Sequence, residues 1–585
     1  MIQHWRLSTI ALSFTVAGLM ILVKLAEIQV AGPDRDYLLR QSDLYSGTWI
    51  TVYPSRGHIY DRWGNLLAGN VAVYQIGLDL QAVTDPAGIA YAVSLITGDE
   101  YDRVYRIASQ DPSPEVRFPI VTDYVPYDQV QQLDNLRRTL ASLENRSEKQ
   151  PIKSLHGLIF TPHLTRSYPE GDLGSNVLGF FSRNGQGYFG VEEQYDELLS
   201  GKPTRVWVPE DPYLVEDLPD IPPGADIVLT IDREIQEMVE DILDNAVTRN
   251  GAEAGTIIVL DPRTGEILSM ATFPRIDPNE YWESGEMISG TTPFNPAVSN
   301  AYEPGSVYKI LTMAAALDDG AVDLDTIFRD EGRIEVGGAV IRNWNLGAWG
   351  EQDMLGCLQH SLNVCLAWIA TRLGPGTFYD YMSDFGLGHA TGVDLAGEVP
   401  GRLKLPGDWD WYPADLATNS FGQGVSVTPL QMAIAAAALA NDGEIMAPRI
   451  LRSLVNNGHQ YNPPPQLIAT PIEAETARTI TMLLAASLEN EASTALVPGY
   501  RLAGKTGTAE IPTPFGYTSN VTNVSFVGWG PVDDPQFVVY VWLEKPTSSI
   551  WGSIVAAPIF SAVVERLVLL MNIPPDDIRL GAAAP

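Results

Sequence analysis

The chain has 585 residues, which is too long for one compact core and indicates two or more folded units. Hydrophobic residues make up 45% of the sequence, so a wholly disordered chain is excluded. Acidic residues outnumber basic ones by 72 to 37, and the net charge of −35 argues against a nucleic-acid partner because it repels phosphate backbones.

The first predicted element is an apolar helix near the N-terminus. Residues 7–23 carry no charge, and 17 residues are the lower limit for a helix that crosses a bilayer. A cleaved signal peptide has a similar pattern, but no pair of small residues spaced for cleavage follows this run. We therefore predict that residues 1–30 form a cytoplasmic tip and a single transmembrane anchor, with the acidic remainder outside the membrane.

A first folded domain is predicted over residues 31–222, where short apolar runs alternate with polar turns. β-Branched and aromatic residues predict a strand at 48–53, and helical patterns cover 125–147 and 191–199. A proline-rich segment at 217–224 predicts the end of this domain.

A second domain is predicted over residues 223–572. Strands come first, a helix-rich middle follows, and strands return before a final helix, which predicts an α+β fold with one antiparallel sheet covered by helices. We expect a loose tail over 573–585. The predicted elements are a helix at 232–248 that Asp232 caps, a final helix at 556–571, and strands at 226–230, 254–260, 266–272, 501–509, 523–530 and 536–544.

Two cysteines, Cys357 and Cys365, lie in a segment, 354–371, whose pattern predicts one helix. Eight residues of helix rise by about 12 Å, which is too far for a disulfide bond. We therefore interpret both cysteines as small buried apolar side chains that are not bonded to each other.

Ser306 and Lys309 are the first candidates for catalysis. Pro304 and Gly305 interrupt the chain and an apolar helix is predicted over 307–317, so Ser306 begins a helix and Lys309 follows one turn later on the same face. The helix dipole and burial both disfavour an ammonium, and neutral Lys309 is then a base for the serine hydroxyl. An N-capping serine beside a solvated lysine is the alternative, because S-x-x-K alone is a weak signal.

Ser361 and Asn363 form an S-x-N triplet within the predicted helix 354–371. Helical residues two apart face different directions, so both can point into one cleft only at a helix end or in a loop. A hydroxyl and an amide there can relay a proton and hold a peptide backbone. Taken alone, the triplet has no diagnostic value.

A third cluster is Lys505, Thr506, Gly507 and Thr508, in a predicted strand. Alternation puts Lys505 and Gly507 on one face, and the glycine allows another backbone to approach closely. An edge strand there can bind an extended peptide by strand addition, while the lysine and hydroxyl groups hold a terminal carboxylate. An ordinary strand with a bulge is the alternative.

The three motifs, in the order S-x-x-K, S-x-N and K-T-G, resemble those of the penicillin-binding protein and serine β-lactamase superfamily. Residues 56–65 and 187–196 resemble two segments of the non-catalytic pedestal of class B penicillin-binding proteins. Residues 421–431, 551–553 and 556–558 resemble transpeptidase-domain segments. The resemblance implies a serine β-lactamase/transpeptidase-like domain on an elongated, dimerisation-type pedestal, and we find no segment for a separate glycosyltransferase domain.

The resemblance also implies a reaction. A serine attacks the penultimate D-alanine of a peptidoglycan stem peptide, terminal D-alanine leaves, and an amine from a neighbouring stem resolves the acyl-enzyme. The implied roles are nucleophile for Ser306, base for Lys309, proton network for Ser361 and Asn363, carboxylate binding for Lys505, Thr506 and Thr508, and an oxyanion hole from the backbone N–H groups of Ser306 and Thr508. β-Lactams are expected to trap the serine covalently.

Several alternatives stay open at this stage. A class A β-lactamase would need a glutamate in an E-x-x-L-N string, which the sequence lacks. A D,D-carboxypeptidase uses the same motifs, and a membrane scaffold or β-lactam sensor would keep them without turnover. Residues 497–504 and the pedestal are closer to the division type than to the elongation type of class B enzyme.

The expected partners follow from the division-type resemblance. They are peptidoglycan stem peptides, a SEDS-type glycan polymerase and other divisome membrane proteins, met through the anchor and the pedestal. We expect no nucleic acid, no cofactor and no metal, since the seven histidines form no cluster with ligand spacing.

Overall fold

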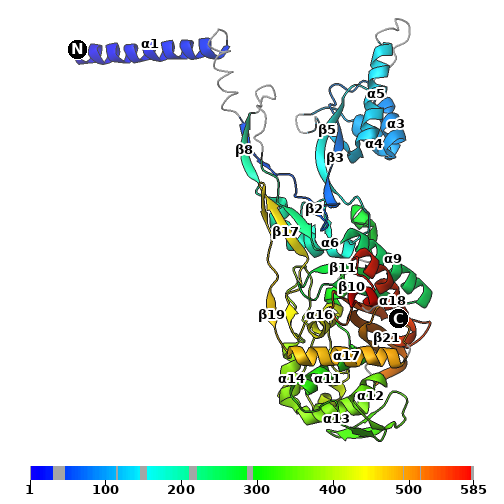
Figure 1. The fold of residues 1–585 in the computed structure, drawn as a ribbon. Helices are drawn as coiled ribbons and strands as arrows, with labels where there is room; N and C mark the ends of the chain where they lie inside the picture. The colour runs from blue at the N-terminus through cyan, green and yellow to red at the C-terminus, as the bar shows by residue number, and fades with distance from the viewer. Residues whose placement is uncertain are drawn as a thin grey trace. The chain divides into compact units, whose positions relative to one another are not determined.

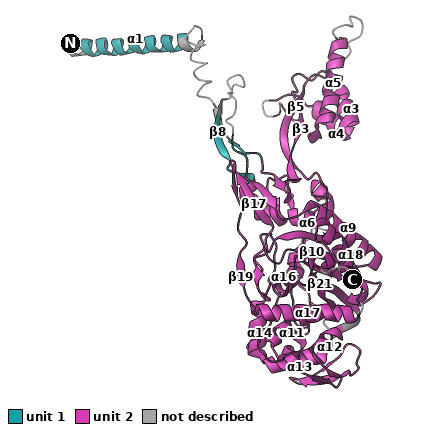
Figure 2. Cartoon of the chain, in the orientation of Figure 1, with its two compact units in different colours: residues 1–55, 200–224 teal, residues 56–199, 225–585 magenta. Residues whose placement is uncertain are grey.

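The computed structural model describes residues 2–30, 47–113, 116, 118–144, 155–209, 221–285, 294–491, 493–513 and 516–581. These residues form two compact units, which Figure 2 shows in different colours: residues 1–55 with 200–224, and residues 56–199 with 225–585. Residues 217–220 of the predicted boundary segment and 582–585 of the predicted tail lie outside the described residues.

The first unit contains a long apolar helix and a two-stranded sheet. In helix α1 (Ile2–Val30), the 23 residues Trp5–Glu27 have a mean hydropathy of 2.0 and are not buried, so this helix is long and apolar enough to cross a membrane. Strands β1 (Gly47–Val52) and β8 (Thr204–Pro209) pair antiparallel. The predicted apolar helix and the predicted strand at 48–53 are confirmed.

The second unit is built around a five-stranded antiparallel sheet in the order β11-β10-β22-β21-β20. Strand β20, which carries the K-T-G motif, is at the edge of this sheet, which is the position that strand addition requires. The five strands are β10 (Ala254–Leu260), β11 (Ile267–Phe273), β20 (Ala503–Thr513), β21 (Gly516–Gly530) and β22 (Phe537–Glu544). All five overlap strands predicted from the sequence.

Helices cover both faces of this sheet because side chains alternate along each strand. On β10, Ile257 packs into the hydrophobic cluster of α9 and α18, whereas Ile258 packs into the cluster of α11 and α16. In Figure 1, α9 and α18 lie side by side. The helices of the two layers are α9 (Arg233–Asn250), α18 (Gly552–Leu570), α11 (Lys309–Asp318) and α16 (Pro429–Ala440).

Helix α9 begins at a local capping signal, whereas the role of helix α18 is clear only from its packing in the folded unit. Asp232 caps α9 as predicted, since its side chain accepts hydrogen bonds from the backbone N–H groups of Glu234 and Ile235. Helix α18 has the length and hydropathy of a membrane span, but half of it is buried within the unit. Its apolar side chains cover the sheet, so α18 is a core helix.

A mostly helical region follows β11 and carries the first two motifs. It contains 3-10 helices, α-helices and short paired strands, and the chain returns from it through α17 (Ala474–Asn490) to β20. The other elements are η2 (Pro278–Ser284), α10 (Pro296–Ser299), η3 (Gly305–Tyr308), β12 (Phe328–Asp330), β13 (Arg333–Val336), β14 (Ala339–Arg342), β15 (Gly350–Gln352), α12 (Met354–Gln359), α13 (Asn363–Leu373), α14 (Pro375–Asp384), α15 (Pro413–Asn419), β16 (Ile445–Met446) and β19 (Leu467–Ala469).

The predicted single helix over 354–371 is wrong, and so is the interpretation of its cysteines. Helix α12 ends at Gln359 and α13 begins at Asn363, so the chain turns between them. The turn brings the Cα atoms of Cys357 and Cys365 to 6.0 Å, and the two cysteines form a disulfide. The 12 Å estimate failed because it assumed an unbroken helix, although both side chains are buried as predicted.

A second, mixed sheet contains strands from both sides of the predicted domain boundary. Strand β2 pairs parallel with β9, and β9 continues to β17 and β18. The seven strands are β2 (Ile59–Tyr60), β3 (Leu66–Leu78), β4 (Ile120–Pro126), β5 (Leu158–Ser167), β9 (Asp226–Leu229), β17 (Leu451–Asn456) and β18 (His459–Tyr461). The boundary predicted near residue 222 falls between strands of one sheet, and the domain limits stay predictions.

A small helical layer packs on β3, β4 and β5 with its own hydrophobic cluster. It consists of α3 (Pro86–Thr97), α4 (Tyr101–Ala108) and α5 (Tyr127–Glu144), the last of which confirms the predicted helix within the described residues. The helix predicted at 191–199 is split into α7 (Gly190–Gln194) and α8 (Asp196–Ser200). Near these lie α6 (Ser175–Leu178), β6 (Phe180–Phe181) and β7 (Gly187–Tyr188).

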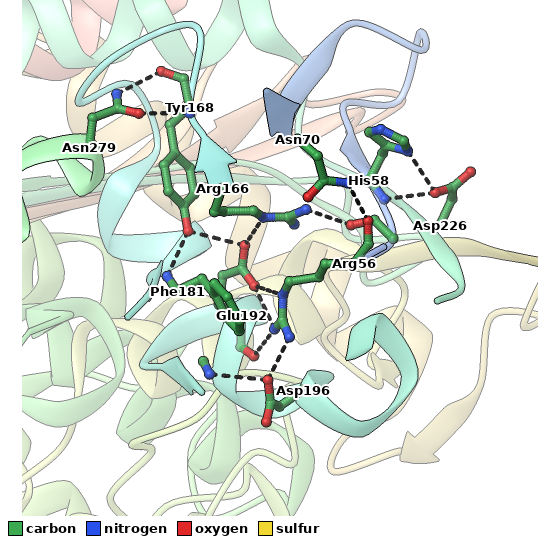
Figure 3. Close-up of polar contacts among 12 residues, drawn as sticks. Arg56, His58, Asn70, Arg166, Tyr168, Phe181, Glu192, Asp196, Asp226 and Asn279 are labelled. Carbon is green, nitrogen blue, oxygen red and sulfur yellow. Dashed lines mark hydrogen bonds and ion pairs between the residues drawn. The ribbon is translucent and has the colours of Figure 1, made fainter. Parts of the chain in front are cut away.

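The two segments that resemble pedestal motifs meet in a buried ion-pair cluster, which Figure 3 shows. Arg56 Nη2 lies 2.6 Å from Glu192 Oε2, and Arg166 Nε lies 2.7 Å from Glu192 Oε1. Asp196 accepts from Arg56 Nη1 at 2.7 Å, and the Tyr168 hydroxyl donates to Glu192 at 3.1 Å. Glu192 is completely buried, and the guanidinium groups of Arg56 and Arg166 compensate its charge.

The C-terminal residues differ from the expected loose tail as far as they are described. Asp576–Arg579 forms the short helix α19, and Arg579 makes an ion pair with Asp533 at 2.7 Å. Ile573 is buried in the cluster beneath α18. An apolar residue and an ion pair therefore hold residues 573–581 against the second unit.

Candidate active site

Ser306 lies where the sequence predicts, at the start of a helical segment. The 3-10 helix η3 contains Ser306, and α11 continues from Lys309. Gly305 has a φ of +61°, and a Cβ at this position would lie 2.6 Å from the carbonyl oxygen of Thr508. Glycine fits both this left-handed backbone and the close approach, which brings the serine turn against the K-T-G strand.

Lys309 joins the first two motifs. Its Nζ lies 2.7 Å from the Ser361 carbonyl oxygen, 3.0 Å from Ser361 Oγ and 2.7 Å from Asn363 Oδ1. A neutral amine has two N–H groups and one lone pair, so it can donate to the carbonyl and amide oxygens and accept a proton from a hydroxyl. The structure thus brings Lys309 together with both side chains of the S-x-N motif.

The electrostatic environment of Lys309 favours the neutral amine. The side chain is fully buried, and its described acceptors are uncharged oxygens. Burial and the nearby positive charge of Lys505 hold the pKa of Lys309 well below its usual range. Burial and the helix dipole are the causes that the sequence predicts for the lowered pKa of Lys309, and the charge of Lys505 is an additional cause.

Ser361 and Asn363 are displayed by the turn between α12 and α13, which resolves the difficulty noted for an unbroken helix. Ser361 has a φ of +52°, and Asn363 is the first residue of α13. Asn363 Nδ2 donates to the Arg342 carbonyl oxygen at 3.2 Å, and Trp344 Nε1 donates to the His360 carbonyl oxygen at 3.1 Å. The segment after β14 thus holds the S-x-N turn in place.

The K-T-G motif occupies the free edge of the five-stranded sheet. Lys505 is buried, and its Nζ lies 3.3 Å from Thr506 Oγ1. Burial lowers the pKa of Lys505 to about 8, although the nearby charge of Glu491 opposes this shift. With this pKa, Lys505 is still mostly a cation at neutral pH and can hold an anionic group.

Gly507 and Thr508 are fixed by close packing against neighbouring segments. A Cβ on Gly507 would lie 2.1 Å from Ser525 Oγ, and one on Gly552 would lie 2.1 Å from the Gly507 carbonyl oxygen. Thr508 Oγ1 accepts a hydrogen bond from the Gly552 N–H at 3.0 Å. The Thr508 hydroxyl proton is thereby left to donate to a bound ligand.

The other segments identified by resemblance also support the site. Gly305 N donates to the Gly422 carbonyl oxygen at 3.0 Å, so the glycine-rich segment at 421–431 holds the backbone before Ser306. Residues 551–553 contain Gly552, which packs on the K-T-G strand. In both segments, a glycine allows the backbone of a neighbouring segment to approach closely.

Sequence reasoning missed two groups near these motifs, Glu491 and Trp344. Glu491 interacts with Lys505, and burial raises the pKa of the Glu491 carboxyl. Trp344 and Trp551 contact each other edge to face at 5.4 Å, one from the segment that holds the S-x-N turn and one beside Gly552. Trp551 belongs to the segment 551–553 that resembles the transpeptidase domain, whereas no motif pointed to Trp344 or Glu491.

The sheet covered on both faces, with a serine–lysine helix against a K-T-G edge strand, defines a serine acyl-transfer enzyme. Residues 255–565 match the penicillin-binding protein transpeptidase domain, and residues 51–211 match the penicillin-binding protein dimerisation domain. The chain therefore belongs to the penicillin-binding protein transpeptidase family, in the class B arrangement. The resemblance stated from the motifs is confirmed.

Similar proteins agree with this assignment. The chain is 32% identical to stage V sporulation protein D of Bacillus subtilis over 89% of its own length and 79% of that protein. It is 30% identical to the peptidoglycan D,D-transpeptidase FtsI of Escherichia coli over 99% of its length and 94% of that protein. The crystal structure of penicillin-binding protein 3 from Mycobacterium tuberculosis with aztreonam matches with a TM-score of 0.68 and 27% identity, covering 90% of this chain and 98% of that one.

Proposed function

We propose that this protein is a peptidoglycan D,D-transpeptidase that cross-links stem peptides through an acyl-enzyme on Ser306. The observation that carries the proposal is the buried Lys309, whose Nζ lies within 3.0 Å of both Ser361 Oγ and Asn363 Oδ1. A transpeptidase needs a base that is neutral at physiological pH, and the environment of Lys309 favours that state.

Acylation follows from this arrangement. Lys309 takes the Ser306 proton as the hydroxyl oxygen attacks the carbonyl carbon of the penultimate D-alanine. The negative charge that develops on the carbonyl oxygen is stabilised by the backbone N–H groups of Ser306 and Thr508, and one such donor is typically worth about 3–4 kcal/mol. The contact between Gly305 and the Thr508 carbonyl oxygen supports this pairing of the two segments.

The donor peptide is held by the edge strand. Strand β20 can add the extended donor as a further strand, which fixes the scissile carbonyl next to Ser306. The Lys505 ammonium, with the hydroxyl groups of Thr506 and Thr508, binds the terminal carboxylate. Gly507 keeps the strand close to Ser525 and Gly552.

Leaving and acceptor groups exchange protons through the S-x-N motif. The terminal D-alanine departs with a proton that Lys309 gives back through Ser361 Oγ. An amine from a neighbouring stem then enters, loses its proton to the same network and attacks the acyl carbonyl. Asn363 Oδ1 orients the Lys309 amine throughout. A β-lactam enters in place of the donor and leaves Ser306 acylated, consistent with the relative that was crystallised with aztreonam.

The proposed cellular role is septal wall synthesis. The alignment with FtsI along 99% of this chain supports a division role over an elongation role. Helix α1 is the single membrane anchor, the remaining domains lie outside the cytoplasmic membrane, and a SEDS-type glycan polymerase and other divisome membrane proteins are the partners. Depletion of the protein should then give filaments, whereas an elongation enzyme would give rounded cells.

Covalent labelling tests the proposed nucleophile. The full-length chain in detergent is incubated with a fluorescent penicillin, beside Ser306→Ala and the matched control Ser142→Ala, an exposed serine in α5. We expect persistent labelling of the wild type and of Ser142→Ala, and none of Ser306→Ala. Labelled Ser306→Ala protein would refute the assignment.

A second assay separates transpeptidation from hydrolysis. A synthetic donor ending in D-Ala-D-Ala is offered with and without an amine acceptor, and the products are weighed by mass spectrometry. We expect cross-linked product in amounts that increase with acceptor concentration. Hydrolysed donor alone, at every acceptor concentration, would identify a D,D-carboxypeptidase.

A further inference from the structure

The Cys357–Cys365 disulfide closes the loop that carries the S-x-N motif. Cys357 lies in α12 and Cys365 in α13, and Ser361 is the central residue of the nine that the bond encloses. Both cysteines are completely buried in the main hydrophobic cluster of the second unit. The cross-link therefore joins the two helices from the core side of the turn.

Every described hydrogen-bond partner of the Lys309 amine comes from this enclosed loop. The carbonyl oxygen and the hydroxyl of Ser361 and the side-chain oxygen of Asn363 lie 2.7–3.0 Å from Lys309 Nζ. Lys309 itself is on α11, outside the loop. A displacement of the loop by an ångström would break these contacts together, and misplacement of this size can cost about 100-fold in rate.

The backbone of the loop needs external restraint. Ser361 has a φ of +52°, in the left-handed region that a residue with a Cβ seldom adopts. Local hydrogen bonds from Ser361 N to Leu358 O and from Leu362 N to Cys357 O accompany the turn. A cross-link four residues before and after Ser361 removes many of the alternative conformations that the loop could otherwise adopt.

The two sides of the loop are held differently. On the polar side, Val364 N donates to Asn343 Oδ1 at 3.2 Å and Trp344 Nε1 donates to the His360 carbonyl oxygen at 3.1 Å. Trp344 is about half exposed, so its hydrogen bond competes with water. On the buried side, the disulfide is a covalent restraint that solvent does not reach.

We propose that the Cys357–Cys365 disulfide is a positioning element of the acylation machinery, which holds Ser361 and Asn363 around the Lys309 amine. The inference rests on the proposed function, because it concerns the same base and the same acyl transfer. The cross-link forms when two thiols lose two protons and two electrons to a disulfide-containing oxidant, which is reduced to two thiols. Such chemistry suits a domain outside the cytoplasm.

Three variants of the full-length chain in detergent separate cross-linking from packing. Cys357→Ser with Cys365→Ser removes the bond and adds two hydroxyl groups. Cys357→Ala with Cys365→Val removes the bond but keeps the site apolar. Val563→Ala, a buried position of α18 in the other hydrophobic cluster, is the matched control for a weakened core. The readouts are thiol content in denaturant, fraction folded, and the second-order rate of acylation by a fluorescent penicillin against pH.

We expect no titratable thiol in the wild type, and acylation per folded molecule that is about 10- to 100-fold slower in both double variants. In both double variants, the ascending limb of the rate–pH profile moves to higher pH. Water that enters the loosened loop relieves the desolvation that disfavours the ammonium form of Lys309. Val563→Ala should keep the wild-type rate and profile. If the variants only weakened the hydrophobic core, the fraction of folded protein would fall and the rate–pH profile would stay that of the wild type.

Two results would overturn the proposal. Two free thiols in the wild-type chain would show that the bond is absent, and a wild-type rate and pH profile in the alanine–valine variant would show that packing suffices. The alanine–valine variant decides the question even if the serine pair fails to fold. A wild-type chain that takes no label would contradict the proposed function itself, whereas labelled wild type with unaffected variants contradicts the positioning role alone.

Discussion

Two groups of buried cations in the second unit have opposite electrostatic settings. In the pedestal segments, Arg56 and Arg166 are bound to the carboxylate of Glu192 at 2.6 and 2.7 Å. In the catalytic region, Lys309 is also buried, but its described hydrogen-bond partners are neutral oxygens. The nearby charge that acts on its pKa is that of the Lys505 cation. Burial is common to both regions, and the partners differ.

The different partners distinguish a charge that stabilises the fold from a group that can exchange its proton in a reaction. An arginine bound to a buried carboxylate stays charged, and the pair joins distant segments of the chain. A lysine that is buried among neutral acceptors loses the stabilisation of its charge, so its pKa falls and it gives up its proton more readily. The contrast predicts that substitutions in one region change stability and those in the other change rate.

The largest effect is expected for Lys309→Met. Without a base for the Ser306 proton, penicillin acylation should fall by about 10³-fold, while the protein stays folded because no buried carboxylate is left uncompensated. The measurement is the second-order acylation rate, with Lys545→Met as the control, a partly exposed lysine paired with Glu253. A loss below tenfold would remove Lys309 from the base role.

The next effect tests the pedestal. Glu192→Gln leaves Arg166 without its carboxylate partner in a buried site and leaves Arg56 with Asp196 alone of its two carboxylates, and we expect about 3 kcal/mol lower unfolding free energy in urea. Acylation per folded molecule should be unchanged. Glu197→Gln, at an exposed position of α8, serves as the control. A slower acylation at unchanged stability would show that the comparison between the two regions is wrong.

A smaller effect is expected for Asn363→Ala. The variant removes one of three hydrogen-bond partners of Lys309 Nζ and the bond to the Arg342 carbonyl oxygen, so acylation should fall about tenfold. Asn490→Ala, an exposed asparagine at the end of α17, is the matched control. Equal rates for the two variants would mean that Ser361 alone orients the amine.

Much of the fold and site could be predicted because the relevant signals are local. All five strands of the five-stranded sheet overlap predicted strands, Asp232 indicated the start of α9, and Pro304 with Gly305 indicated the turn before Ser306. The K-T-G segment was expected to form a strand, and it lies in β20 at the edge of the sheet.

The failures have a tertiary cause. The break between α12 and α13 requires Ser361 to adopt a positive φ, which its sequence neighbourhood does not indicate, and the disulfide follows from that break. The pairing of β2 with β9 joins segments that are far apart in the chain. The charge of Lys505 near Lys309 is likewise a product of folding and not of local pattern.

The pH dependence of penicillin acylation by the full-length wild-type chain tests the central claim most directly. Lys309 must be neutral, so the rate should rise with pH through a limb far below the usual pKa of a lysine. Lys505 must be charged to hold the carboxylate, so the rate should fall again through its pKa of about 8. A bell-shaped profile whose descending limb disappears in Lys505→Met supports the account, and a rate that climbs steadily to about pH 10 contradicts it.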